Sequence, residues 1–307
     1  MLTSTTDRLS GRTAFITGGS RGIGLAIACK LAEAGVNVAI AAKTVEPHPR
    51  LEGTIHTARA AIEAAARHGA RALALQMDVR DDASVEAAIA RTVEVFGGLD
   101  IVINNASAIA LEDSAALPMK RFDLMHQINT RGTYLVSRTA LPHLEASGHA
   151  HILMLAPPLN LSPRWFAPHL GYSLAKYGMS LCVLGLAEEL RGRGIGVNAL
   201  WPRTYIATAA VANVVGDAES LKGSRSPEIM ADAAREILSR DPRAESGNFH
   251  IDDDVLSQAG LRDFSRYRLD AKAPLHLDMF LDPDMPLPPG SDLAGSDPAG
   301  RRDARRA

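Results

Sequence analysis

A tyrosine and a lysine one helical turn apart are the residues of this chain best suited to proton chemistry. Tyr172 and Lys176 enclose the sequence Ser-Leu-Ala within a stretch, 170–191, that reads as a helix. The i,i+4 spacing places both side chains on one helix face. A free phenol has a pKa near ~10, and a neighbouring ammonium favours the phenolate. We therefore expect Tyr172 to give and take protons; the alternative is an unremarkable pair on a surface helix.

A second chemical signal is the glycine-rich run Thr17-Gly18-Gly19-Ser20-Arg21-Gly22-Ile23-Gly24. An apolar strand candidate precedes it and a helical stretch follows it. A strand that turns through glycines into a helix gathers unpaired N–H groups and the positive helix end at one point, which suits a pyrophosphate. Gly18 allows the tight turn, Gly22 allows close approach of the ligand, and Gly24 allows the helix to pack on the sheet. The alternative is an ordinary strand-to-helix connection.

Charged residues near this turn indicate which dinucleotide would bind. The strand after the first helix ends at Lys43, where an acidic residue would favour NAD and a basic one tolerates a 2′-phosphate. Arg21 can reach the same region, so we expect NADP rather than NAD; otherwise Lys43 is a solvated surface lysine. Asp78, followed by Val79, closes another apolar run, and it is expected either to accept a hydrogen bond from the adenine or to cap the helix that begins near Asp82.

The elements that must position these residues alternate regularly between strand and helix. The strand candidates are 13–16, 36–42, 72–76, 101–104, 151–155, 195–200 and 248–251, and the helical stretches include 54–68, 82–96, 118–144, 170–191 and 227–239. Continuous apolar strands alternating with helices predict an α/β fold: a Rossmann-type, doubly wound parallel sheet of about seven strands in a single domain. Ligands of such sheets bind beyond the carboxyl ends of the strands.

Composition divides the chain into a long domain and a short tail. Residues 9–280 read as the nucleotide-binding domain, whereas 281–307 are rich in proline and glycine and poor in apolar residues, so we expect a flexible tail. The connection 204–226 is long for such a fold, which favours a mobile lid.

Bulk composition excludes several classes of function. The chain has 307 residues, 46% of them hydrophobic, and a net charge of −2, which gives no reason to expect a nucleic-acid or membrane partner. No apolar run reads as long enough to span a bilayer, and the N-terminus does not resemble a signal peptide. Cys29 and Cys182 read as reduced core residues, and the ten histidines are scattered. We expect a soluble cytoplasmic protein without a metal site.

Four motifs together resemble the short-chain dehydrogenases/reductases. They are the turn 17–24, Asn104-Asn105-Ala106, Asn129 and the pair Tyr172–Lys176, in the order and spacing of that family. The resemblance covers about residues 9–255. It extends to the hydroxysteroid dehydrogenase-like type 2 branch, specifically its dehydrogenase part, through the stretches 41–44, 47–49, 104–109, 129–134 and 198–202.

The resemblance implies an NADP-dependent oxidoreductase that moves a hydride between nicotinamide and a small carbonyl or alcohol substrate. Tyr172 would be the acid/base, Lys176 would tune its pKa and bind the nicotinamide ribose, and Asn129 would anchor a proton-relay water. The long helices 118–144 and 170–191 would form a homodimer or homotetramer interface. The expected cofactor contacts are Thr17, Gly18, Ser20, Arg21, Gly22, Ile23, Gly24, Lys43, Asp78, Val79, Asn105, Ala106, Tyr172, Lys176, Pro202 and Thr208.

One family feature is missing. The serine that normally precedes the tyrosine by about thirteen residues, and holds the substrate oxygen, is replaced by Leu159, with Ala-Pro-Pro at 156–158. Asn160 and Ser162 lie on the same connection. Either they supply the missing hydrogen bond to the substrate oxygen, or they are simply turn residues. Losing one such donor lowers a rate by about 100- to 1000-fold. The rival hypothesis is therefore an NADP(H)-binding protein with weak or lost catalysis.

Other positions near the missing serine allow two interpretations each. Trp165 and Phe166 form either an apolar substrate wall or core anchors. Arg203 stands where the family commonly has glycine, and it would either meet an acidic substrate group or point into solvent.

Overall fold

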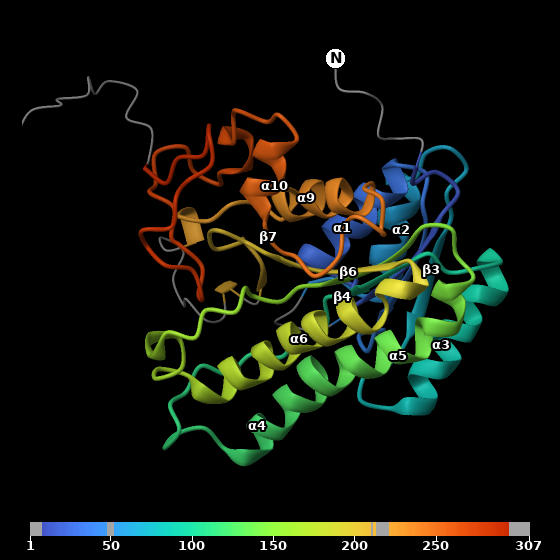
Figure 1. Ribbon diagram of the computed structural model, residues 1–307, viewed down its shortest axis with the longest axis horizontal. Helices are drawn as coiled ribbons and strands as arrows, with labels where there is room; N and C mark the ends of the chain where they lie inside the picture. The colour runs from blue at the N-terminus through green and yellow to red at the C-terminus, as the bar shows by residue number, and fades with distance from the viewer. Residues whose placement is uncertain (1–7, 48–51, 210, 213–220, 295–307) are drawn as a thin grey trace, which may run out of the picture.

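Seven parallel strands form one sheet in the order β3-β2-β1-β4-β5-β6-β7 (Figure 1). The computed structural model describes residues 8–47, 52–209, 211–212 and 221–294. The strands are β1 (Thr13–Thr17), β2 (Asn37–Ala42), β3 (Ala72–Gln76), β4 (Ile101–Asn104), β5 (Ala150–Met154), β6 (Ile195–Trp201) and β7 (Phe249–Ile251). The predicted doubly wound parallel sheet is confirmed. Its strand order reverses between β1 and β4, and a crevice opens at such a point.

Helices cover both faces of the sheet (Figure 1). One face carries α1 (Gly22–Glu33), α2 (Ile55–Ala65), α9 (Glu228–Leu238) and α10 (Asp252–Gln258); the other carries α3 (Asp82–Phe96), α4 (Met119–Met125), α5 (Gly132–Glu145) and α6 (Leu170–Glu189). Successive strand residues point to opposite faces. Ala14 and Ile16 therefore join the core under α1 and α9, while Phe15 between them joins the core under α5 and α6. This two-sided burial explains why the strands are continuously apolar.

The most apolar helix, α6, is a core helix. It has 20 residues and a mean hydropathy of 1.2 over its most apolar window, so it has the length and composition of a membrane span, contrary to the sequence expectation. However, 61% of that window is buried inside the protein. Its apolar character is explained by packing against β6 and the segment before α5.

The predicted long helix 118–144 is interrupted. After α4 the chain forms a π-helical turn, η2 (His126–Arg131), before α5 begins at Gly132. Thr130 Oγ1 of this turn donates a hydrogen bond of 3.0 Å to the carbonyl of Ala175 in α6. Such turns are rare and frequently lie at functional sites.

Residues 275–291 form what we call the C-terminal strap. It runs antiparallel to the segment after β6: Tyr205 N–H donates to His276 O at 2.9 Å, and Asp278 N–H donates to Arg203 O at 2.9 Å. Leu281 is 2% exposed. The flexible tail expected from residue 281 stays a prediction: within 281–294, Leu281 is buried and Ser291 bonds to the domain, while 295–307 lie outside the described residues.

The expected lid, 204–226, is described only in part, because 210 and 213–220 lie outside the described residues. Its two ends are bridged to each other, with Ala207 N–H donating to Arg225 O at 2.9 Å.

Candidate functional site

A cavity of about 1390 Å³ lies at the carboxyl ends of the strands. Segments that follow β1 to β6 all contribute to its wall, as the doubly wound topology requires. The predicted residues that line it are Gly18, Ser20, Arg21, Gly22, Ile23, Lys43, Asp78, Val79, Asn105, Ala106, Tyr172, Lys176, Pro202 and Thr208. Thr17, Gly24, Asn129, Asn160, Ser162 and Trp165 are not part of its lining.

The glycine turn presents open backbone donors to the cavity. Arg21 precedes α1 in an extended conformation, and its side chain does not cap the helix. Among the residues that the structure describes, no side chain accepts from the first N–H groups of α1. Gly22 has a φ of +56°, and a Cβ there would lie 3.3 Å from Thr208 Cγ2. Open donors, a positive helix end and a close-approach glycine fit the pyrophosphate of a dinucleotide.

Thr17, Gly24 and Asn105 shape the turn from behind. Asn105 Nδ2 donates to the carbonyls of Thr17 and Gly18, both at 3.0 Å. Thr17 Oγ1 accepts the N–H groups of Asn105 and Ala106, both at 3.1 Å. A Cβ on Gly24 would lie 2.5 Å from Asn105 Nδ2, so only glycine allows this clamp. Thr17 and Gly24 therefore position the turn from outside the cavity lining.

Charged side chains gather at the part of the cavity wall that follows β2 and β3. Lys43 Nζ lies 3.2 Å from Asp78 Oδ2, and Arg80 Nη2 lies 2.6 Å from the same oxygen. Arg80 and then Lys43 hold the pKa of Asp78 well below its usual range, although partial burial opposes them. The Lys43 side chain is 61% exposed. Sequence reasoning missed Arg80, which no motif marks.

Arg21 and the helix cap refine two expectations at this end of the cavity. The Arg21 guanidinium donates to Glu52 O and Gly53 O, both at 2.8 Å. These bonds hold it against the segment before α2, part of which also lines the cavity. Asp81, and not Asp78, caps α3 by accepting the N–H of Ser84 at 3.1 Å. The capping alternative for Asp78 is thus wrong; its side chain lines the cavity while paired with Arg80 and Lys43.

Tyr172 and Lys176 are buried together on α6, at 5% and 4% exposure. Lys176 Nζ donates to Leu155 O at 2.9 Å and lies 5.2 Å from the Trp201 ring centroid. Burial lowers the pKa of Lys176 to about 8. Burial, assisted by the negative charge of Asp278, raises the pKa of Tyr172 well above its usual value. The expected lowering of the tyrosine pKa by Lys176 is therefore wrong for this structure, because loss of water around the buried phenol raises that pKa.

Asn129 is fully buried in the π-helical turn. Its Oδ1 accepts the N–H of Ala108 at 2.8 Å, and its Nδ2 donates to the carbonyl of the same residue at 3.0 Å. The side chain thus fixes the loop after β4, one wall of the cavity. Its role as the anchor of a water stays a prediction.

The predicted substrate contacts lie beneath the strap instead of in the cavity lining. Asn160 Nδ2 donates to Asp282 at 2.9 Å, and Asn160 Oδ1 accepts the N–H of Ser162 at 3.1 Å. The Trp165 ring lies 6.0 Å from that of Phe280. Asn160 and Trp165 thus contact the strap, and Ser162 bonds to Asn160, which favours the turn and core alternatives for these residues.

The strap brings an unpredicted acid to the cavity. Asp278 lines it with Met279, Trp201 and Tyr205, close to the tyrosine–lysine pair. Its Oδ1 accepts the N–H of Met279 at 2.7 Å. Burial raises the pKa of Asp278 to about 7. The mixed apolar run 275–281 is the sequence signal for this segment, and it matches neither a helix nor a strand pattern.

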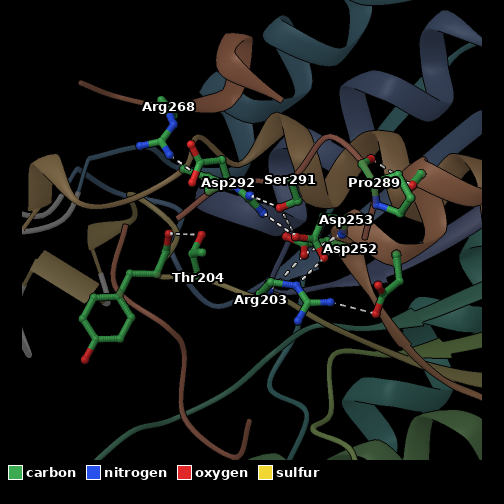
Figure 2. Close-up of polar contacts among 12 residues, drawn as sticks. Arg203, Thr204, Asp252, Asp253, Arg268, Pro289, Ser291 and Asp292 are labelled. Carbon is green, nitrogen blue, oxygen red and sulfur yellow. Dashed lines mark hydrogen bonds and ion pairs between the residues drawn. The ribbon is translucent and has the colours of Figure 1, made fainter. Parts of the chain in front are cut away.

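A buried ion network anchors the strap (Figure 2). Asp253 pairs with Arg203 Nε at 2.6 Å and with Arg225 Nη1 at 3.1 Å, all three almost fully buried. Ser291 of the strap accepts from Arg225 at 2.8 Å and donates to Asp253 at 2.7 Å. Asp252 accepts the N–H of Arg203 at 2.9 Å. Arg203 is thus a structural cation, and both sequence interpretations of it are wrong.

Comparison with known proteins agrees with this geometry. Residues 12–219 match the family model described as short chain dehydrogenase. The chain is 54% identical over 277 residues to hydroxysteroid dehydrogenase-like protein 2 of Danio rerio, a match that covers 90% of this chain and 65% of the relative. The chain thus spans somewhat less than two thirds of that curated relative.

Two solved structures are similar over nearly their whole length. A protein from Xanthomonas campestris shares 52% identity with a TM-score of 0.86, covering 89% of this chain and 99% of its own. A short chain dehydrogenase from Mycobacterium thermoresistibile shares 48% identity with a TM-score of 0.84, covering 94% and 100%. Sheet order, glycine turn and tyrosine–lysine pair agree with these matches, and the chain belongs to the short-chain dehydrogenase/reductase family of oxidoreductases, which bind nicotinamide cofactors.

Proposed function

We propose that this protein is an NADP(H)-dependent oxidoreductase acting on a small carbonyl or alcohol substrate. One observation carries the proposal: the glycine turn, the basic end at Lys43 and the buried Tyr172–Lys176 pair all face one cavity. The turn offers donors to a pyrophosphate, and the pair lies at the other end of the cavity wall, where a substrate oxygen would need a proton partner.

Each residue has a separable role in this reaction. A bound nicotinamide supplies or accepts the hydride. Tyr172 donates its phenolic proton to the substrate oxygen during reduction and takes it back during oxidation. Lys176, held by Leu155 O, places a positive charge near the phenol and the expected nicotinamide ribose. Asn129 fixes the loop after β4 through Ala108 and is the proposed anchor of the proton-relay water.

NADP is proposed over NAD on the basis of charge. Lys43 and Arg21 both line the cavity at the end where the adenosine ribose is expected. A 2′-phosphate beside two cations gains charge-assisted hydrogen bonds. Lys43 pairs with Asp78, but its side chain is largely exposed. Because Arg80 also pairs with Asp78, Lys43 can leave Asp78 and bind a phosphate without leaving that carboxylate unpaired.

NADPH oxidation with a panel of ketones and quinones tests this function. We expect turnover by the unaltered protein and a loss of at least about 1000-fold in Tyr172→Phe, which lacks the transferable proton. Tyr134→Phe, on an exposed residue of α5, is the matched control. Equal activity of Tyr172→Phe would remove Tyr172 from the proposed role.

The rival function, dinucleotide binding without efficient catalysis, is favoured by one observation. Leu159 stands at the spacing of the family serine, after the buried Ala156 and two prolines, and none of these side chains can donate a hydrogen bond. Calorimetry showing tight NADPH binding by a protein that turns over no member of the panel would select this rival.

Assembly and location are further proposals. Leu181 and Leu184 on α6 are 60% and 45% exposed, and α5 and α6 are the expected contact of a homodimer or homotetramer. Light scattering that gives a monomer mass would exclude this assembly.

The cellular location is a separate proposal. Two free thiols, Cys29 and Cys182, support a reducing compartment such as the cytoplasm, which cell fractionation would test.

A further inference from the structure

The strap holds one carboxyl group at the catalytic end of the cavity. Asp278 is fixed on one side by its own N–H, which donates to Arg203 O at 2.9 Å. On the other side Trp201 Nε1 donates to Met279 O at 2.9 Å. The next residue, Phe280, is fully buried and packs its ring 6.3 Å from that of Tyr172. The position of Asp278 is therefore set by backbone hydrogen bonds and by an aromatic anchor that also contacts the catalytic tyrosine.

The two oxygens of this carboxyl group differ. Oδ1 accepts the N–H of Met279 at 2.7 Å. Within the described ranges, Oδ2 has neither a hydrogen bond nor an ion pair, although Asp278 lines the cavity. Lys176, the nearby cation, is committed to Leu155 O at 2.9 Å. One carboxyl oxygen is thus available to a molecule in the cavity.

We propose that Asp278 binds the substrate oxygen together with Tyr172, and so takes the place of the serine that this chain lacks after β5. This inference rests on the proposed function. The serine position itself cannot supply the bond, because Leu159 stands there and has no polar side-chain atom. The nearest polar candidates, Asn160 and Ser162, are not part of the cavity lining, and the Asn160 amide is bonded to Asp282 and to the N–H of Ser162. The strap, which lies outside the residues matched by the family model, delivers the missing polar group from another part of the chain.

A carboxyl group donates a hydrogen bond only while it is protonated. Burial and, in its charged form, Asp252 of α10 raise the pKa of Asp278 to about 7, against the N–H of Met279 and the positive Lys176. Burial also raises the pKa of Asp252 to about 7. The phenols of Tyr172 and Tyr205 also face it, and its charge raises the pKa of each. Asp278 therefore holds its proton in a substantial part of the molecules near neutral pH. A neutral acid of this kind can stabilise the charge that develops on a carbonyl oxygen.

Kinetics of NADPH oxidation with phenanthrenequinone and cyclohexanone test the inference. We expect Asp278→Ala to lower kcat by about 100-fold with little change in the KM for NADPH. Asp278→Asn should be about 10-fold more active than Asp278→Ala, because its amide carbonyl keeps the Met279 bond and its Nδ2 still donates. Asp284→Asn, the same change at an exposed position of the strap, is the control and should match the unaltered protein.

The pH dependence separates a hydrogen-bonding role from a structural one. In the unaltered protein, kcat/KM for reduction should fall as pH rises through about 7, where Asp278 loses its proton. Asp278→Asn should lack this fall, while both proteins keep any change due to Lys176, whose pKa is lowered to about 8. If Asp278→Ala fails to fold or to bind NADPH, the pH dependence of kcat/KM in Asp278→Asn tests the inference instead.

Three outcomes would overturn the inference in distinguishable ways. Asp278→Ala with unaltered kcat and pH profile, alongside an inactive Tyr172→Phe, would overturn the inference alone. An Asp278→Asn profile that still falls through neutral pH would do the same. No turnover by the unaltered protein with either compound would overturn the proposed function together with the inference that rests on it.

Discussion

The two ends of the cavity, the proposed nucleotide end at the glycine turn and the proposed catalytic end at Tyr172, hold their polar groups in different ways. At the nucleotide end, backbone N–H groups of the turn 17–24 face the cavity, and side chains such as Thr17 and Asn105 support them from behind. At the catalytic end, the polar groups are side chains, Tyr172, Lys176 and Asp278, brought from α6 and from the strap. The first arrangement suits an anion of fixed shape. The second places titratable groups where water is scarce, which changes their pKa values.

The difference extends to what stabilises each end. The glycine turn depends on the absence of side-chain atoms, because a Cβ at Gly24 would collide with Asn105. The strap depends on buried charge, because Ser291 is tied to Arg225 and Asp253 (Figure 2). A steric fault should therefore damage the nucleotide end selectively, whereas an unpaired charge should destabilise the whole C-terminal part of the domain.

The largest predicted effect comes from breaking the buried network. Asp253→Ala leaves Arg203 and Arg225 buried without their shared partner, which should lower the free energy of unfolding by about 3–5 kcal/mol. Urea unfolding followed by circular dichroism measures it. Glu188→Ala, which removes an exposed partner of Arg191, should cost less than about 1 kcal/mol. Equal losses in the two variants would show that the network does not anchor the strap.

A smaller effect is expected from adding one methyl group to the turn. Gly24→Ala places a Cβ 2.5 Å from Asn105 Nδ2, and relief of that overlap should cost about 1–3 kcal/mol and displace the turn. We expect the Kd for NADPH, measured by calorimetry, to rise at least about 10-fold. Gly185→Ala on α6, where the added Cβ meets nothing within 4 Å, is the matched control. Unchanged affinity in Gly24→Ala would argue against the turn as the pyrophosphate site.

The smallest effect concerns the choice of cofactor. Lys43→Glu replaces a cation that lies 3.2 Å from Asp78 by a second acid, so the Kd for NADPH should rise by about 10-fold while that for NADH changes much less. The same substitution at Lys120, an exposed residue of α4, controls for net charge. Parallel changes for both dinucleotides at Lys43 would contradict the proposed 2′-phosphate contact.

The sequence predicted the strand, glycine turn and helix at 13–33 better than it predicted the strap, for physical reasons. A strand, a glycine turn and a helix are local, so neighbouring residues specify them. The strap has few apolar residues after Phe280, and its burial depends on Ser291 meeting Arg225 and Asp253, which are far apart in the chain. No pattern among neighbouring residues predicts hydrogen bonds between residues so far apart in the chain. For the same reason Asp278 was missed, and Trp165, whose ring packs near Phe280, was equally open to a substrate interpretation.

The most direct test of the central claim is a crystal structure of the protein with NADPH bound. The account predicts that the pyrophosphate lies against the N–H groups of the turn 17–24 and that the nicotinamide ring lies beside the Tyr172 hydroxyl, with Lys176 at its ribose. A nicotinamide ring placed away from Tyr172, or a dinucleotide bound outside the cavity lined by Gly22 and Lys176, would contradict it.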